Sequence, residues 1–286
     1  MIAALYDVPA PAKLNLFLHL IGRREDGYHL LQSVFALIDW CDTLHFERRQ
    51  DARLARHDSA AALPADDLCL RAARLLQAES GSRHGVDITI DKQVPWGAGL
   101  GGGSSDAATT LLALNRLWEL HWSRERLLAL ALRLGADVPF FVAGSNAWVE
   151  GIGERLTPIE LAPRWWAVLK PAAVVPTAAI FGSPTLARNT AAATLPDFAA
   201  NPLWFGRNDL QAGAIAYCGE VAEALALLHG RFGASRMSGS GSAVFADAGS
   251  GDSPSIAMLQ AQELAPSWVG RMCRGLPGHP LAQWAT

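Results

Sequence analysis

Residues 95–110 read PWGAGLGGGSSDAATT, and this stretch decides the fold. Five of the seven residues over 97–103 are glycine, and Ser104, Ser105 and Asp106 follow them. Glycine lets backbone N–H groups come close to a ligand, because no Cβ intervenes. The start of a helix adds unpaired N–H groups and the positive end of the helix dipole. The combination predicts an anion site, most often one for phosphates.

The segments on both sides of this loop support that prediction. Residues 86–91 read VDITID, and this alternation of apolar and polar residues is typical of a half-buried strand. Apolar residues at helical spacing follow the loop, namely Ala107, Leu111, Leu114 and Trp118. We expect Ser104 or Ser105 to cap that helix. Strand, glycine loop and helix together predict a cradle for nucleotide phosphates.

Other glycine motifs fit less well. Gly97, Gly99 and Gly102 also satisfy G-x-G-x-x-G, but a dinucleotide fold needs an acidic residue about 20 positions further on to bind the ribose. Glu119 follows Gly102 by 17 positions and lies at the far end of the helix, out of reach of a ribose. No lysine follows the glycines, as a P-loop requires. A flexible Gly/Ser linker is the remaining alternative, and it would not lie between a strand and a helix.

Composition limits the class of protein. The 286 residues are 50% hydrophobic and 18% charged, which indicates a globular chain of one large or two modest domains. A net charge of −3 without a long Lys/Arg run argues against nucleic acid or an anionic membrane as partner. The four widely spaced cysteines, without a C-x-x-C pair, indicate reduced thiols rather than a zinc site. With no signal peptide and no membrane span in the sequence, we expect a cytoplasmic protein.

The N-terminal region reads as a β-hairpin. Residues 12–20 predict a strand with Leu14, Leu16, Leu18 and Leu20 on one face and Lys13, Asn15, Phe17 and His19 on the other. Lys13 and Asn15 are then about 7 Å apart along one face. Asp26-Gly27 is a strong turn signal, and strand-like residues 30–46 follow it.

The rest of the chain alternates helices and strands. Helical patterns cover residues 68–78, 124–134 (ending at Gly135), 220–229 and 256–264. Strand patterns cover residues 165–169 and 242–246, and residues 148–158 turn through Gly151 and Gly153. Residues 187–202, rich in Ala, Pro and Asn, predict an exposed connection. We place a domain boundary near residue 155.

Three blocks together resemble the GHMP small-molecule kinases. They are PAKLNL at 11–16 with DGYH at 26–29, the glycine loop with its helix start at 95–108, and MSGSGS at 237–242. The resemblance covers nearly the whole chain and is weakest over 187–202 and after Gly249. It implies an α/β fold, more closely an α+β fold of two lobes, with the active site in the cleft between them. It also implies transfer of the γ-phosphate of ATP to a hydroxyl, with Mg²⁺.

The resemblance divides the chain into an N-terminal ATP-binding domain, 1–155, and a C-terminal substrate-binding domain, 156–286. By motif match, Lys13 and Asp137 are the catalytic pair. The ATP loop comprises Pro95, Trp96, Gly97, Ala98, Gly99, Leu100, Gly101, Gly102, Gly103, Ser104 and Ser105. A second loop, on the side of the phosphates, comprises Ser238, Gly239, Ser240 and Gly241.

Within the family, DGYH after PAKLNLFL resembles members that phosphorylate a cytidine diphosphate alcohol. The implied reaction occurs at the 2-hydroxyl of a methylerythritol group, gives a 2-phosphate and ADP, and belongs to non-mevalonate isoprenoid biosynthesis. The implied substrate-binding residues are Asn15, Tyr28, His29, Thr177 and Phe181. A mevalonate- or homoserine-type kinase and a non-catalytic nucleotide-binding regulator stay open as alternatives. As for partners, a weak homodimer stays open.

The residue types suit this chemistry. Phosphoryl transfer depends on positioning and charge neutralisation. Asp137 can accept the proton of the attacking hydroxyl, while Lys13 can hold Asp137 ionised and offset charge on the γ-phosphate. Tyr28 and Phe181 offer aromatic faces for a pyrimidine, and His29 offers ring hydrogen bonds. Taken singly, each of these residues would be an ordinary surface, turn or core residue; their occurrence together and in order carries the prediction.

Two features depart from the family pattern or stay undefined. Family members usually carry asparagine before the leucine that opens the 68–78 helix, where adenine is held. This chain has Asp66-Asp67 there, and an aspartate cannot donate as an amide does. The metal ligands are not defined by the sequence, although Ser105 and Asp137 are the nearest candidates by motif.

Overall fold

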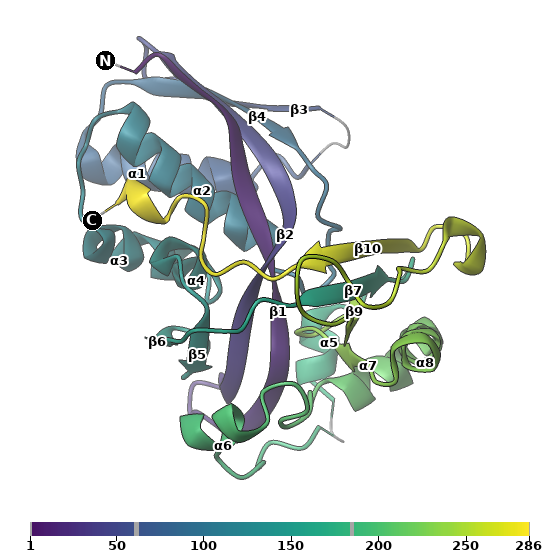
Figure 1. Cartoon of the computed structure of the whole chain (residues 1–286). Helices are drawn as coiled ribbons and strands as arrows, with labels where there is room; N and C mark the ends of the chain where they lie inside the picture. Colours follow the sequence, from purple (N-terminus) through teal and green to yellow (C-terminus); the bar gives the residue numbers. More distant parts are fainter. Residues whose placement is uncertain (1, 60–62, 184–185, 286) are drawn as a thin grey trace.

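A long antiparallel hairpin forms the spine of the protein. The computed structural model describes residues 2–59, 63–183 and 186–285. Strands β1 (Ala4–Arg23) and β2 (His29–Arg49) run through both halves of the molecule (Figure 1). The predicted turn joins them, and Arg24 donates its backbone N–H to the carbonyl of Tyr28. The hairpin therefore carries Lys13 and Asn15 in its first strand and places Tyr28 and His29 at its closed end.

The first sheet of the described chain has six strands. Its order is β3-β4-β2-β5-β6, with β1 also paired to β2. The added strands are β3 (Leu54–Asp58), β4 (Gly85–Asp91), β5 (Ala147–Glu150) and β6 (Arg155–Pro158). Helices α1 (Leu68–Ser80), α2 (Gly102–Leu117), α3 (Arg124–Leu134) and α4 (Val138–Ala143) share one hydrophobic core with this sheet. The strand predicted at 86–91 and the helices predicted at 68–78 and 124–134 are confirmed.

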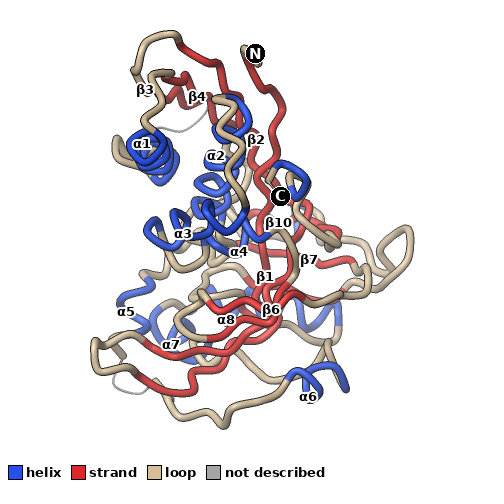
Figure 2. The backbone as a smooth tube through the Cα atoms, turned by 90° about the vertical axis from the view of Figure 1, so that its left-hand side faces the viewer, coloured by secondary structure: helices blue, strands red, loops and turns tan. Residues whose placement is uncertain are grey.

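A second sheet, of four strands within the described residues, has the order β10-β7-β9-β8. Its strands are β7 (Trp165–Lys170), β8 (Arg236–Met237), β9 (Val244–Asp247) and β10 (Val269–Arg274). The accompanying helices are α5 (Thr177–Phe181), α6 (Leu195–Ala200), α7 (Gln211–Tyr217) and α8 (Gly219–Phe232). A core cluster joins residues of β1 and β2 in the first sheet to residues of β7, β9 and β10 in the second. Figure 1 and Figure 2 both show β7 and β10 beside the middle of the hairpin.

The predicted alternation along residues 12–20 is wrong in one respect. Phe17 packs with Leu14 and Leu16 in the same hydrophobic core instead of on the opposite face. The pairing of β1 with β2 shifts register between Asn15 and Leu18, and such a bulge reverses the face on which the following side chains lie. Lys13 and Asn15, which precede the shift, do share one side, since the Lys13 ammonium donates to the Asn15 side-chain oxygen at 2.5 Å.

Three other predictions about local structure need correction. Helix α2 begins at Gly102 with Gly101 as its N-cap and no side-chain cap, so neither Ser104 nor Ser105 caps it. Residues 256–264 form no α-helix. They form an extended segment that ends in a 3₁₀ turn at Ala261–Glu263, and its alternately buried residues pack on the second core, which the second sheet shares with α7 and α8. Residues 187–202 are largely exposed, as predicted, but contain α6, because Thr194 and Asp197 form a capping box.

The C-terminal segment returns to the first sheet and its helices. Leu276 donates its backbone N–H to the carbonyl of Leu37, and Arg124 donates to the carbonyl of Ala285 at 2.6 Å. A 3₁₀ turn at Ala282–Trp284 packs against α2, where the Arg116 guanidinium lies 5.0 Å from the centre of the Trp284 ring. The division into 1–155 and 156–286 stays a prediction. Within the described residues, no helix combines the length and apolar character that crossing a bilayer requires.

Candidate active site

The glycine loop has the backbone shape that the sequence predicts. Gly97, Gly99 and Gly101 have positive φ angles of 63°, 74° and 74°, in the left-handed region that favours glycine. A Cβ on Gly99 would lie 2.2 Å from the carbonyl oxygen of Ser238, closer than any real contact. The loop lines a cavity of about 210 Å³, the nucleotide-side cavity, together with Leu68, Lys92 and Val94. Its backbone is therefore exposed at the start of α2, where anions bind well.

Strand β1 is held between the two glycine-containing loops. The backbone N–H of Lys13 donates to the carbonyl of Leu100 at 2.9 Å. The backbone N–H of Asn15 donates to the Ser238 hydroxyl at 3.1 Å, and that hydroxyl donates to the carbonyl of Gly99 at 3.1 Å. The fixed backbone of β1 thus sets where the Lys13 side chain lies relative to the glycine loop.

Lys13 and Asp137 are brought together as predicted. Their ammonium and carboxylate groups are 3.3 Å apart, with the lysine buried and the aspartate one-third exposed. The ammonium also lies 4.3 Å from the centre of the Phe35 ring, besides its contact with Asn15. Asp137 is the N-cap residue of α4, directly after the turn that follows α3. Both residues line a cavity of about 340 Å³, which we call the central cavity.

Four of the five predicted substrate residues gather at the closed end of the hairpin, whereas the fifth, Asn15, lines the central cavity. Tyr28, His29, Thr177 and Phe181 line a cavity of about 620 Å³, the acceptor-side cavity. The rings of His29 and Phe181 are 4.9 Å apart at an angle of 34°. Tyr28 is 60% exposed, so its ring is available to a ligand. The hydroxyl groups of Thr177 and Ser240 are 2.7 Å apart, which joins α5 to the second glycine loop.

The three cavities form a continuous row. The nucleotide-side and central cavities share Gly97, Gly99 and Gly101. The central and acceptor-side cavities share a wall of five residues, Leu31, Ala136, Ile152, Thr177 and Phe181. The predicted catalytic pair lies on the middle cavity alone. A ligand in the first cavity and a second ligand in the third would meet at Lys13 and Asp137.

Two predicted site residues lie away from these cavities. Ser105 is fully buried, and its hydroxyl has no hydrogen-bond partner among the described residues. Ser238 is also fully buried and acts through its contacts with Asn15 and Gly99. Among the residues that the structure describes, no three His, Cys, Asp or Glu side chains are grouped as a metal site.

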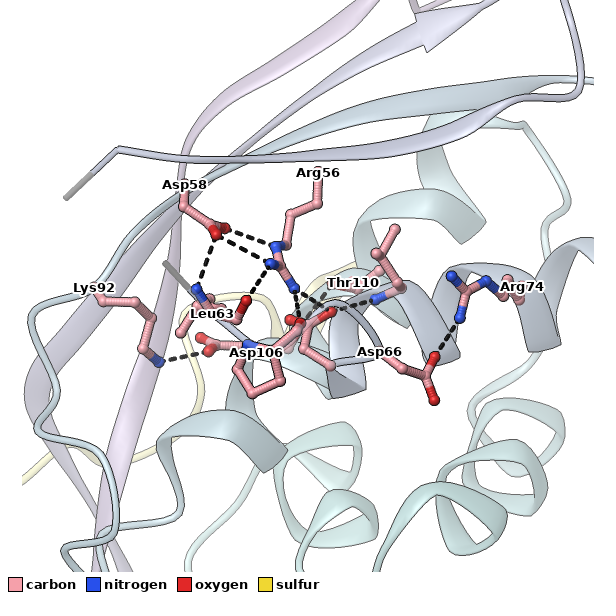
Figure 3. A network of polar contacts seen from close by, with 11 residues as sticks. Arg56, Asp58, Leu63, Asp66, Arg74, Lys92, Asp106 and Thr110 are labelled. Carbon is pink, nitrogen blue, oxygen red and sulfur yellow. Dashed lines mark hydrogen bonds and ion pairs between the residues drawn. The ribbon is translucent and has the colours of Figure 1, made fainter. Parts of the chain in front are cut away.

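A polar network borders the nucleotide-side cavity (Figure 3). The Lys92 ammonium bonds the carboxylates of Asp106, at 2.6 Å, and of Asp42. Burial raises the pKa of Asp106, and the neighbouring charge of Asp42 adds to this rise. Asp67 caps α1 and pairs with Arg56 at 2.8 Å, so its carboxylate already has partners inside the protein. This explains how an aspartate is accommodated where the resemblance implies asparagine.

Sequence reasoning missed two residues beside the site. Lys92 lines the nucleotide-side cavity, and its place between strand β4 and the glycine loop was a usable signal. Arg188 donates to the ring of His29 at 2.9 Å, from a position 159 residues further along the chain. No local pattern marks Arg188, because its partner is set by the tertiary fold.

Comparison with known proteins agrees with this geometry. Residues 67–145 match the model of the GHMP kinases N terminal domain, and residues 189–262 match that of the GHMP kinases C terminal. The chain belongs to the GHMP kinase family. It is therefore a small-molecule kinase, and kinases of this family use ATP.

Individual relatives narrow the family further. The chain is 79% identical, over 99% of its length and 98% of the relative's, to 4-diphosphocytidyl-2-C-methyl-D-erythritol kinase of Methylibium petroleiphilum. A crystal structure of 4-(cytidine 5'-diphospho)-2C-methyl-D-erythritol kinase is similar with a TM-score of 0.75 and 35% identity, covering 93% of this chain and 98% of the other. A crystal structure of mevalonate kinase has a TM-score of 0.66 at 13% identity, covering 94% and 98%, and shares the fold alone.

Proposed function

We propose that the protein transfers the γ-phosphate of ATP to the 2-hydroxyl of 4-diphosphocytidyl-2-C-methyl-D-erythritol, giving the 2-phosphate and ADP in non-mevalonate isoprenoid biosynthesis. The observation that carries the proposal is the row of three cavities with the Lys13–Asp137 pair on the middle one. The identity of 79% to a kinase of that name supports the substrate. A mevalonate- or homoserine-type acceptor lacks a pyrimidine, so it would not need the aromatic residues of the acceptor-side cavity.

The residues divide the work by position. The glycine loop, Pro95 to Ser104, binds the ATP phosphates through backbone N–H groups at the start of α2. Asp137 accepts the proton of the attacking hydroxyl or orients it, a role that typically contributes about 10²–10⁴-fold. The buried ammonium of Lys13 offsets the charge that develops on the transferred phosphoryl group. Asn15 keeps that ammonium in place through its side-chain oxygen.

Magnesium is the metal we propose. When bound, Mg²⁺ neutralises charge on the ATP phosphates and usually keeps several water ligands. Of the two candidates that the sequence names, the Asp137 carboxylate lies on the central cavity and would hold the metal, whereas the Ser105 hydroxyl is buried and lines none of the three cavities. Hard oxygen donors of this kind suit Mg²⁺ better than softer metals.

The acceptor-side cavity binds the cytidine diphosphate group. Tyr28 and Phe181 supply aromatic faces for the base, and His29 supplies a hydrogen bond to its edge. Thr177 lies against Ser240 and so connects the acceptor to the loop that faces the phosphates. The division into an ATP-binding domain, 1–155, and a substrate-binding domain, 156–286, stays a prediction, as do a cytoplasmic location and a weak homodimer.

The deciding experiment measures ADP release from Mg-ATP with the cytidine compound, run beside mevalonate and homoserine. Turnover with the cytidine compound alone is the expected result. Turnover with either other alcohol would keep the fold and the catalytic pair but contradict the assignment of the acceptor-side cavity. ATP binding without turnover of any of the three would favour a non-catalytic regulator.

A further inference from the structure

Arg188 donates a hydrogen bond to the ring of His29, and three further hydrogen bonds to backbone carbonyls hold the arginine in place. Its Nε donates to His29 Nε2 at 2.9 Å. Its other nitrogens donate to the backbone carbonyls of Phe181 at 3.0 Å, Ser183 at 2.8 Å and Leu186 at 3.0 Å. The guanidinium is thus held by these three carbonyls, and among the described residues only its bond to His29 reaches a side chain that lines the acceptor-side cavity.

This contact determines where the His29 proton is. A guanidinium only donates, so His29 Nε2 must accept. In a neutral imidazole the other nitrogen, Nδ1, then carries the hydrogen. Burial lowers the pKa of His29, and the positive charges of Arg188 and Arg23 lower it further, so the neutral form is favoured.

The surroundings of His29 contain no charge that would reverse this preference. Among the described residues that line the same cavity, the titratable or charged side chains are those of Arg23, Asp26 and Tyr28. Asp26 is paired with Arg24 at 2.7 Å, which leaves its carboxylate already neutralised. The ring also lies against Phe181, so it has an apolar neighbour on one face. His29 therefore offers the cavity a neutral ring with one N–H donor.

We propose that Arg188 is a positioning residue that holds His29 as the neutral Nδ1–H form, and that this single donor selects cytosine over uracil in the acceptor. The inference rests on the proposed function, because it requires a pyrimidine in the acceptor-side cavity. Cytosine presents acceptors at O2 and N3, whereas N3 of uracil carries a hydrogen. Both bases accept at O2, so the selection requires that the donor face N3, where a fixed N–H bonds cytosine and opposes the hydrogen of uracil. A histidine free to exchange its proton between nitrogens would accept either base.

The test compares Arg188→Met, which removes the donor and the charge, with Arg188→Lys, which keeps both. We expect Arg188→Met to raise KM for the cytidine compound about tenfold and to narrow the cytidine-to-uridine ratio of kcat/KM by a similar factor, as loss of one oriented hydrogen bond predicts. The KM for ATP and kcat change less than about threefold, because the catalytic pair is untouched. Arg188→Lys recovers part of the base ratio.

Two further measurements separate positioning from a general structural effect. Ring ¹⁵N chemical shifts should identify Nδ1–H as the His29 tautomer in the wild type and a mixture in Arg188→Met. The KM of Arg188→Met for the cytidine compound should gain a pH dependence near the ordinary histidine pKa, about 6.5. Arg231→Met is the control, since Arg231 lies on α8, outside the acceptor-side cavity, and should leave the base ratio and tautomer unchanged.

An unchanged base ratio in Arg188→Met, with wild-type turnover intact, would overturn this inference alone. Finding the Nε2–H tautomer of His29 in the wild type would also overturn it. That measurement needs no variant, so it stays decisive even if Arg188→Met fails to fold. A wild-type enzyme that turned over neither the cytidine nor the uridine compound would instead contradict the proposed function, and this inference with it.

Discussion

The two end cavities of the site differ in their lining: backbone lines one, and side chains line the other. The nucleotide-side cavity is lined mostly by one continuous backbone segment, residues 95–104, whose glycines set its shape. The acceptor-side cavity is lined by side chains from distant segments, including Tyr28 and His29 of the hairpin and Thr177 and Phe181 of α5. Phosphates, common to every ATP-dependent kinase, suit a backbone cradle, whereas one particular acceptor needs individual side chains. The proposed catalytic pair, Lys13 and Asp137, lies on the central cavity, where these two ends meet.

The largest effect is expected at that meeting point. Asp137→Asn removes the carboxylate that faces the Lys13 ammonium at 3.3 Å and leaves the shape of the central cavity nearly unchanged. We expect kcat to fall about 10²–10⁴-fold, the usual contribution of a general base, with ATP affinity preserved. Single-turnover kinetics and ATP calorimetry measure the two quantities. Asp252→Asn, at an exposed position outside all three cavities, is the control. Near-normal turnover in Asp137→Asn would remove the general-base role and leave only orientation of the hydroxyl.

The backbone design of the nucleotide end predicts the next largest effect, from Gly99→Ala. The new methyl group would lie 2.2 Å from the carbonyl of Ser238, at a φ of 74° that costs about 1–2 kcal/mol for a residue other than glycine. Both loops must shift, so we expect the KM for ATP to rise at least about tenfold and the melting temperature to fall. Gly103→Ala is the matched control, because its nearest contact would be an ordinary 3.8 Å. Equal behaviour of the two variants would contradict the backbone design.

The contrast between the two ends explains how much the sequence could predict. The glycine loop and its flanking strand and helix were predictable because local backbone preferences determine them. The resemblance located Asp137 and Phe181, but nothing local distinguishes either from a turn or core residue. Arg188 and the bulge that moves Phe17 escaped prediction, since each depends on contacts between segments far apart in the chain. The helix pattern at 256–264 failed for the same reason: packing against the second core overrides its periodicity.

At the acceptor end, a single side chain should matter to one ligand only. Tyr28 is 60% exposed, so Tyr28→Ala should leave the free energy of unfolding within about 0.5 kcal/mol. Loss of a stacked aromatic ring typically costs about 1–3 kcal/mol per base, so KM for the cytidine compound should rise about 5- to 150-fold. KM for ATP should not change. Tyr217→Ala, at a similarly exposed tyrosine on α7, is the control for loss of an aromatic surface residue. A parallel rise in both KM values would mean that the two ends are not separate.

The smallest effect concerns the contact that joins the two designs. Thr177 belongs to the acceptor-side helix and Ser240 to the second glycine loop, and their hydroxyl oxygens are 2.7 Å apart. Thr177→Val keeps the shape and removes the hydrogen bond, so we expect kcat/KM for the acceptor to fall about two- to tenfold, the value of one neutral hydrogen bond. A double-mutant cycle with Ser240→Ala isolates the pair, because the second substitution should cost nothing further once the first has broken the contact. Additive losses of kcat/KM would mean that each hydroxyl contacts its own ligand. The Lys13–Asp137 pair, and not the Thr177–Ser240 contact, would then couple the nucleotide-side cavity to the acceptor-side cavity.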